Sequence, residues 1–126
     1  MSKLKQQRGF TLIEILVAMI VLSVGLLGVA GLTVSVIQGN AYSKNVSTAT
    51  VIAEARLEDM RRAGYANTNT TNFSAGPDSV SMGGSPFSRV TSITNNSTAS
   101  GMKTITVRVS WGVGAHAVAL NTILAQ

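Results

Sequence analysis

The sequence contains no cysteine and only one histidine, His116. Without cysteine the chain cannot form the disulfides that stabilise many small extracytoplasmic domains. The ligand patterns of zinc sites, which combine several cysteine and histidine side chains, are excluded as well. Any folded part must therefore be held together by packing alone, and we expect no metal and no other cofactor.

Acidic residues are also scarce, with five Asp and Glu against ten Lys and Arg, and the formal net charge is +5. Three of the basic residues, Lys3, Lys5 and Arg8, lie in the first nine positions, and their removal takes the charge to +2. The high isoelectric point therefore belongs largely to this short leader. It is not the basic surface that a nucleic-acid-binding domain presents, so we do not expect nucleic acid as a partner.

A long apolar stretch follows, and between Phe10 and Ile37 its only charge is Glu14. About 20 apolar residues in a helix cross the ~30 Å hydrocarbon core of a membrane, so this stretch is long enough to span. An ordinary secretory signal has a shorter apolar region of roughly 7–15 residues. The basic leader predicts a cytoplasmic N-terminus. Because a carboxylate inside a membrane helix is costly, Glu14 is expected to have a cationic partner.

The segment GFTLIE, residues 9–14, has basic residues before it and an apolar helix after it. It resembles the class III signal of type IV prepilins and pseudopilins. The resemblance implies that a prepilin peptidase cuts between Gly9 and Phe10 and methylates the new amino group of Phe10. It also implies that Glu14 pairs with the N-terminal amine of a neighbouring filament subunit.

After residue 37 the pattern changes to that of an amphipathic helix that continues to residue 63. Small and apolar residues recur at spacings of three and four, which marks one face of a helix: Val46, Ala49, Ala53, Leu57 and Met60. Glu58 and Arg62 are placed for an i, i+4 ion pair. Arg61 and Arg62 fall in the predicted last turn, and Gly64 is the predicted end of the helix.

Residues 65–101 are rich in Asn, Thr, Ser and Gly and contain both prolines, which predicts a long loop with a short strand at Ser88–Thr94. Residues 102–111 alternate, with Ile105, Val107, Val109 and Trp111 on one face. Residues 112–115 form a turn, and residues 116–124 return as the second strand of a hairpin. We expect the apolar face of this hairpin to pack on the helix at 53–60.

The predicted fold is therefore α+β, with a long N-terminal helix packed against a small C-terminal antiparallel sheet. We divide the chain into a leader (1–9), a transmembrane or filament-core helix (10–37), its amphipathic continuation (38–63) and a loop-and-sheet part (64–126).

No enzyme is expected, because no stretch has the spacing of a nucleophile elbow, a phosphate loop or a metal site. His116 is interpreted as a solvated residue at a strand end, and Trp111 as a core residue rather than a binding aromatic. Five scattered arginines are predicted to be solvated: Arg56, Arg61, Arg62, Arg89 and Arg108. The only catalysed event that the sequence suggests is the processing of this chain by the peptidase.

Two further blocks narrow the resemblance. Residues 21–32, VLSVGLLGVAGL, and residues 53–61, AEARLEDMR, resemble minor pilins of the PilV type. The segment ITVRVSW at 105–111 is similar both to that type and to minor pseudopilins of the GspI type. The favoured interpretation is a minor pilin that primes type IV pilus assembly or forms part of a tip complex. The alternatives are a minor pseudopilin of type II secretion and, from another class, a stand-alone signal-anchored extracytoplasmic binding protein.

The resemblance also implies partners and a location. The partners are the prepilin peptidase and methyltransferase, other minor pilins, the major pilin, the assembly platform and the inner membrane. The protein would cross the inner membrane once, with its N-terminus in the cytoplasm and its C-terminal part in the periplasm, before it enters the pilus.

Overall fold

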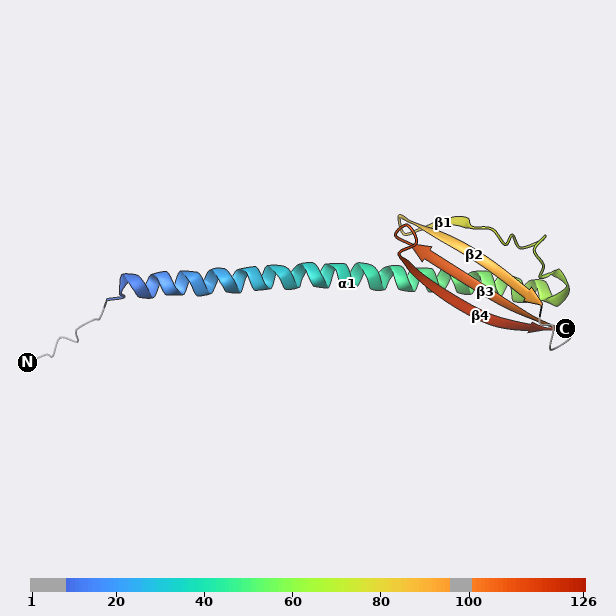
Figure 1. The fold of residues 1–126 in the computed structure, drawn as a ribbon, viewed down its shortest axis with the longest axis horizontal. Helices are drawn as coiled ribbons and strands as arrows, with labels where there is room; N and C mark the ends of the chain where they lie inside the picture. The colour runs from blue at the N-terminus through green and yellow to red at the C-terminus, as the bar shows by residue number, and fades with distance from the viewer. Residues whose placement is uncertain (1–8, 96–100) are drawn as a thin grey trace, which may run out of the picture. The chain divides into compact units, whose positions relative to one another are not determined.

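The computed structural model describes residues 9–95 and 101–126. One helix, α1 (Leu12–Asn67), is followed by four strands: β1 (Asp78–Met82), β2 (Ser85–Asn95), β3 (Met102–Trp111) and β4 (His116–Ala125) (Figure 1). The fold is α+β, as predicted. The chain divides into two compact units, Met1–Asn40 and Ala41–Gln126. The predicted leader charges at positions 3, 5 and 8 lie outside the described residues.

The helix begins at Leu12 and not at Phe10, because Thr11 caps it. The Thr11 hydroxyl accepts a hydrogen bond from the Glu14 N–H at 3.3 Å, and the Thr11 carbonyl accepts one from the same N–H at 3.1 Å. The order Thr-x-x-Glu is the sequence pattern of a capping box. Glu14 therefore lies in the first turn, where the helix dipole favours a negative charge.

The part of α1 in the first unit has no buried side chains. It contains a window with a mean hydropathy of 2.7, and by length and composition this helix is suited to crossing a membrane. Leu16, Leu27 and Ile37 are each more than half exposed. An exposed apolar surface this long needs an apolar environment that the chain itself does not supply.

The regular helix ends at Gly64, as predicted, where the backbone takes φ 77° and ψ 171°. Beyond this point, side chains satisfy the carbonyls of the helix end. The Thr68 hydroxyl lies 3.0 Å from the Met60 carbonyl, and Lys103 on β3 donates to the carbonyls of Tyr65 and Thr68 at 2.7 and 2.9 Å. Lys103 thus supplies the cation that a helix C-terminus favours, although the sequence had suggested Arg61 and Arg62.

The second unit has a four-stranded antiparallel sheet with the order β1-β2-β3-β4. One face of the sheet and one face of α1 share a single apolar core. The buried members from the helix are Ala49, Ile52, Ala53, Leu57 and Met60, and those from the sheet are Phe87, Ile105, Val107, Val109 and Trp111. Every member of the predicted helical stripe belongs to or packs against this core. The predicted hairpin is confirmed, with Trp111 paired to His116 at its closed end.

The loop predicted for residues 65–101 is wrong over β1 and β2. The short strand predicted at Ser88–Thr94 is part of an eleven-residue strand, and β1 was missed entirely. The inward positions of β2 include the polar residues Arg89 and Thr91, which hide the apolar alternation. Gly83 and Gly84 join the two strands with φ 62° and 80°, the left-handed geometry of a tight hairpin turn.

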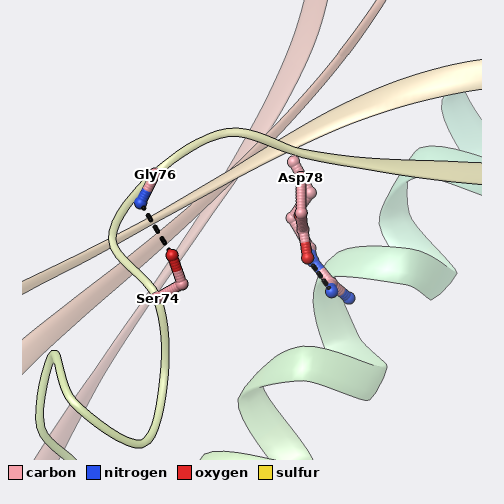
Figure 2. Close-up of polar contacts among 4 residues, drawn as sticks. Ser74, Gly76 and Asp78 are labelled. Atoms are coloured by element: carbon pink, nitrogen blue, oxygen red, sulfur yellow. Dashed lines mark hydrogen bonds and ion pairs between the residues drawn. The ribbon is translucent and has the colours of Figure 1, made fainter.

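The segment between α1 and β1 is fixed by short-range hydrogen bonds and by one ion pair. The Gly76 N–H donates to Ser74 Oγ at 3.3 Å (Figure 2). Arg89 binds the carboxylate of Asp78 with two hydrogen bonds, one of them 3.1 Å between Nε and Oδ1. This bidentate bond keeps the pKa of Asp78 below its usual value, and the positive charge of Arg89 lowers it further. Partial burial of Asp78 has the opposite effect and raises the pKa, but it does not outweigh the bond.

Two of the five arginines are not solvated as predicted. The Arg89 side chain is only 17% exposed because it pairs with Asp78 across the hairpin. The Arg56 guanidinium lies 4.9 Å from the centre of the Phe73 ring, and its Nε is buried without a hydrogen-bond partner. Burial and the nearby charge of Arg89 lower the pKa of Arg56. Arg61, Arg62 and Arg108 are exposed, and Arg62 forms the predicted pair with Glu58 at 3.1 Å.

Candidate functional site

The junction between Gly9 and Phe10 is open and non-helical. Both residues are exposed, and the Phe10 side chain is 80% exposed. The helix starts two residues further on, at Leu12. Exposed backbone outside regular structure is the form in which a peptide bond is accessible to a protease. The predicted cleavage point thus lies directly before a capped helix, where cutting does not require the helix to unfold.

Glu14 lies on an otherwise apolar side of α1. Phe10, Glu14, Ala18 and Leu22 follow one another at intervals of four and, with Ile15 and Met19, line a shallow open groove. Residues four apart stand on the same helix face. Neither of the two ion pairs found among residues 9–95 and 101–126 involves Glu14. A carboxylate on an apolar face, with no cation of the described chain beside it, is suited to receive a cation from another molecule.

One comparison bears directly on this segment. Residues 4–30 match the prokaryotic N-terminal methylation motif. The match includes the Gly9–Phe10 junction, Glu14 and the start of α1, and it indicates a type IV pilin-like protein, either a pilin or a pseudopilin. Proteins with this motif are structural proteins rather than enzymes. No curated protein and no solved structure matches the chain.

The methylation motif also agrees with a membrane-anchored start of the chain, because it overlaps the apolar part of α1. It implies processing by a prepilin peptidase and assembly with a filament. The rest of the chain, from residue 31 onward, lies outside the match. The features of the second unit must therefore be interpreted from its own structure.

The second unit contains an aromatic cluster that sequence reasoning missed. His116 is exposed at the start of β4, as predicted, but its ring lies 5.2 Å from that of Tyr42 and 5.7 Å from that of Trp111, centre to centre. Trp111 is 7% exposed and belongs to the core, which confirms its predicted role. The available signal was the position of Tyr42, because aromatic residues just beyond an apolar span are typical of membrane interfaces.

The described part of the second unit offers no catalytic or metal centre that competes with the N-terminal segment. Within residues 9–95 and 101–126 no three His, Asp or Glu side chains gather as metal ligands would. A cavity beside the aromatic cluster has an apolar lining that includes Phe87 and Trp111, and the serines Ser79, Ser88 and Ser110 also border it. None of these serines is hydrogen-bonded to His116 in the way a nucleophile is bonded to its base.

Proposed function

We propose that this protein is a minor pilin of the PilV type, which primes type IV pilus assembly or forms part of its tip complex. The main observation that supports this proposal is the capped start of α1. It leaves the Gly9–Phe10 bond exposed and sets Glu14 on an apolar face in the first helical turn. In this proposal the peptidase cleaves after Gly9 and methylates the amine of Phe10.

The electrostatics support the pairing of Glu14 with the amine of a neighbouring subunit. A carboxylate at the centre of a membrane helix costs about 2.5–3.5 kcal/mol on insertion scales, and the cost is smaller near the helix end, where Glu14 lies. A cationic amine at a helix N-terminus is disfavoured by the helix dipole. Pairing the two groups between subunits offsets both penalties, and a methylated amine keeps its charge. Removing either partner leaves an uncompensated charge among apolar helices, which is strongly unfavourable.

The exposed apolar surface of α1 supports the remaining steps. The chain inserts once into the inner membrane, with the leader in the cytoplasm and the sheet in the periplasm. Other minor pilins and the major pilin then supply neighbouring helices, and the assembly platform moves the complex out of the lipid. A helix that leaves lipid for a bundle of similar polarity faces no large hydrophobic penalty.

A minor pseudopilin of the GspI type is the second candidate, because the methylation motif and the β3 segment fit it equally well. The two differ in their phenotype. Deletion of a minor pilin reduces surface pili and leaves protein secretion intact. Deletion of a minor pseudopilin reduces protein secretion and leaves surface pili intact. A stand-alone anchored binding protein would alter neither, and in that case replacement of Gly9 would have no consequence.

The first test is the mass of the mature N-terminus, measured on membrane-extracted protein from cells with and without the peptidase. We expect a chain that begins at methylated Phe10 only when the peptidase is present. Gly9→Leu should block the cut, and Gly39→Leu, at a glycine outside the motif, is the matched control. A chain that still begins at Met1 or Ser2, in cells whose peptidase processes other substrates, would overturn the proposal.

A further inference from the structure

The turn between β1 and β2 and the turn between β3 and β4 lie at the same end of the sheet. The β2–β3 register pairs Ser88 with Ser110, and continuing this register sets Ser85 opposite Val113. The Gly83-Gly84 turn and the turn at 112–115 are therefore neighbours (Figure 1). This end of the sheet meets the first residues of the unit's helical segment.

Three contacts locate that meeting point. The Tyr42 ring lies 6.0 Å from the Trp111 ring and 5.2 Å from the His116 ring. A Cβ placed at Gly83 would lie 3.9 Å from Lys44 Nζ, so this ammonium group stands beside the other turn. We call this surface, formed by Tyr42, Lys44, Met82, Val113 and His116, the turn end.

The chemistry of the turn end is that of a surface that contacts a bilayer. Val113 is fully exposed at the hairpin tip, Met82 is 43% exposed and Tyr42 is 51% exposed. Lys44 supplies a positive charge suited to lipid phosphates. Aromatic rings with one apolar and one polar side are enriched at the headgroup level of membranes.

Acidic groups of the described residues are kept away from this surface. On the helix the first carboxylate after Lys44 is Glu54, ten residues and about 15 Å further along. On the sheet Asp78 lies five residues before Gly83, and its charge is compensated by Arg89. Nothing acidic at the turn end therefore repels an anionic lipid surface.

The backbone at the tip gives an independent indication. Val113 has φ 57°, between Gly112 and Gly114, which also have positive φ. A β-branched residue is disfavoured in this left-handed region, which Gly and Asn adopt readily. A strained conformation that presents an apolar side chain to the outside points to a functional contact at that position.

The short stretch of chain between the apolar segment and Tyr42 limits where this contact can occur. Tyr42 follows Ile37 by only five residues, which reach about 18 Å at most when fully extended. If residues 10–37 cross the membrane, the chain is short enough to keep Tyr42 within reach of the headgroups on the outer side. We propose that the turn end rests on the outer leaflet of the inner membrane, with Val113 inserted among the lipids.

This inference rests on the membrane-crossing step of the proposed function and not on its filament role. Because the chain has no cysteine, Val113→Cys introduces a unique thiol. Ile123→Cys is the matched control, because Ile123 is also apolar and exposed but lies near the other end of β4. Val21→Cys reports on the crossing segment itself.

The full-length chain is reconstituted in nanodiscs of phosphatidylethanolamine and phosphatidylglycerol, and each variant carries a nitroxide label. We expect the labels at 113 and 21 to collide preferentially with oxygen, which partitions into lipid. The label at 123 should collide preferentially with a water-soluble nickel chelate. Equal nickel accessibility at 113 and 123, with 21 in lipid, overturns the turn-end contact and leaves the membrane crossing standing. A label at 21 that is accessible to nickel overturns both.

A second measurement avoids substitution at the tip. Trp111 is the only tryptophan, so its fluorescence reports on the turn end of the unmodified chain. Lipids brominated near the headgroup should quench it more strongly than lipids brominated near the chain end. Equal quenching by both, or none, contradicts the proposal. If the 113 label is shielded only after other filament subunits are added, the contact is with protein and the lipid assignment is wrong.

Discussion

The two halves of α1 have the same secondary structure but opposite relations to their surroundings. In the first unit the side chains are apolar and exposed, as at Leu12 and Leu27. In the second unit one face is buried under the sheet, with Ala49, Ala53 and Met60 at 0% exposure. The second half is stabilised by contacts within the chain. The first half must be stabilised by lipid or by other subunits, so its function depends on what surrounds it.

The largest expected effect comes from Glu14→Val, which removes the one charge of the apolar half. We expect cleavage and methylation to continue, because the Gly9–Phe10 bond is unchanged, while incorporation into the pilus complex is lost. The measurements are the mature mass and co-isolation with the other subunits. Glu54→Val, at an exposed acid in the other half, is the control and should assemble normally. Normal assembly by Glu14→Val as the sole copy would contradict the pairing role.

Phe87→Ala should destabilise the second half of the chain and leave the first half unaffected. Phe87 is 2% exposed in the only core of the described residues, and Phe-to-Ala changes in cores cost about 3–5 kcal/mol. With no disulfide to limit the loss, we expect the thermal unfolding midpoint of the sheet unit to fall sharply in detergent, as followed by near-UV circular dichroism. Leu27→Ala, on the exposed apolar half, should leave that midpoint unchanged. Equal shifts for the two variants would show that the halves are not independent.

Lys103→Met should have a smaller effect, confined to the second half. It removes two charge-assisted hydrogen bonds to the end of α1 and the contact 4.2 Å above the Tyr65 ring. We expect a loss of about 1–2 kcal/mol in the free energy of unfolding, because partly exposed charged hydrogen bonds contribute in this range. Denaturant titration measures it. Arg108→Met on the exposed sheet face should change stability by less than about 0.5 kcal/mol.

The smallest effect is a pH dependence that originates at Asp78. Arg89 lowers the pKa of Asp78 in the folded state. The Asp78–Arg89 pair therefore makes its full contribution to the free energy of unfolding above the unfolded-state pKa of about 3.9. It is lost as the pH falls through the lower folded-state value. The Asp78 side chain is 44% exposed, so we expect less than about 1 kcal/mol. Unfolding curves at pH 7 and pH 3 should differ less in Asp78→Asn than in the unaltered chain. An equal pH response would assign the effect to other carboxyl groups.

The sequence predicted the elements whose side chains follow one clear period. The stripe from Val46 to Met60 and the alternation of Ile105, Val107 and Val109 each have a single apolar face, so helix and hairpin were recognisable. β2 was recognised only in part, because Arg89 and Thr91 occupy inward positions where an apolar residue was expected. Its partner β1 has only Val80 and Met82 as apolar residues, and the Gly83-Gly84 signal that joins the strands was overlooked.

Tertiary contacts could not be predicted in the same way. The cation at the helix end comes from Lys103, 38 residues beyond Tyr65, and the partner of Asp78 comes from the next strand. The N-terminal segment was predictable because its information is local: a junction, an acid at a fixed distance and an apolar helix. The roles given to Gly9, Phe10 and Glu14 stay predictions until processing is measured.

The Thr11 cap separates two events that are often linked in processed proteins, maturation and folding. Cleavage at the proposed bond leaves Thr11 as the second residue of the shortened chain, so the hydrogen bonds that start α1 are retained. Helix nucleation is the unfavourable step of helix formation, and here it does not depend on the leader. Removal of the leader therefore changes the charge at the end of the helix without changing where the helix begins. If the bond is cut as proposed, the peptidase acts on a helix whose start is already formed, and assembly can follow without a refolding step.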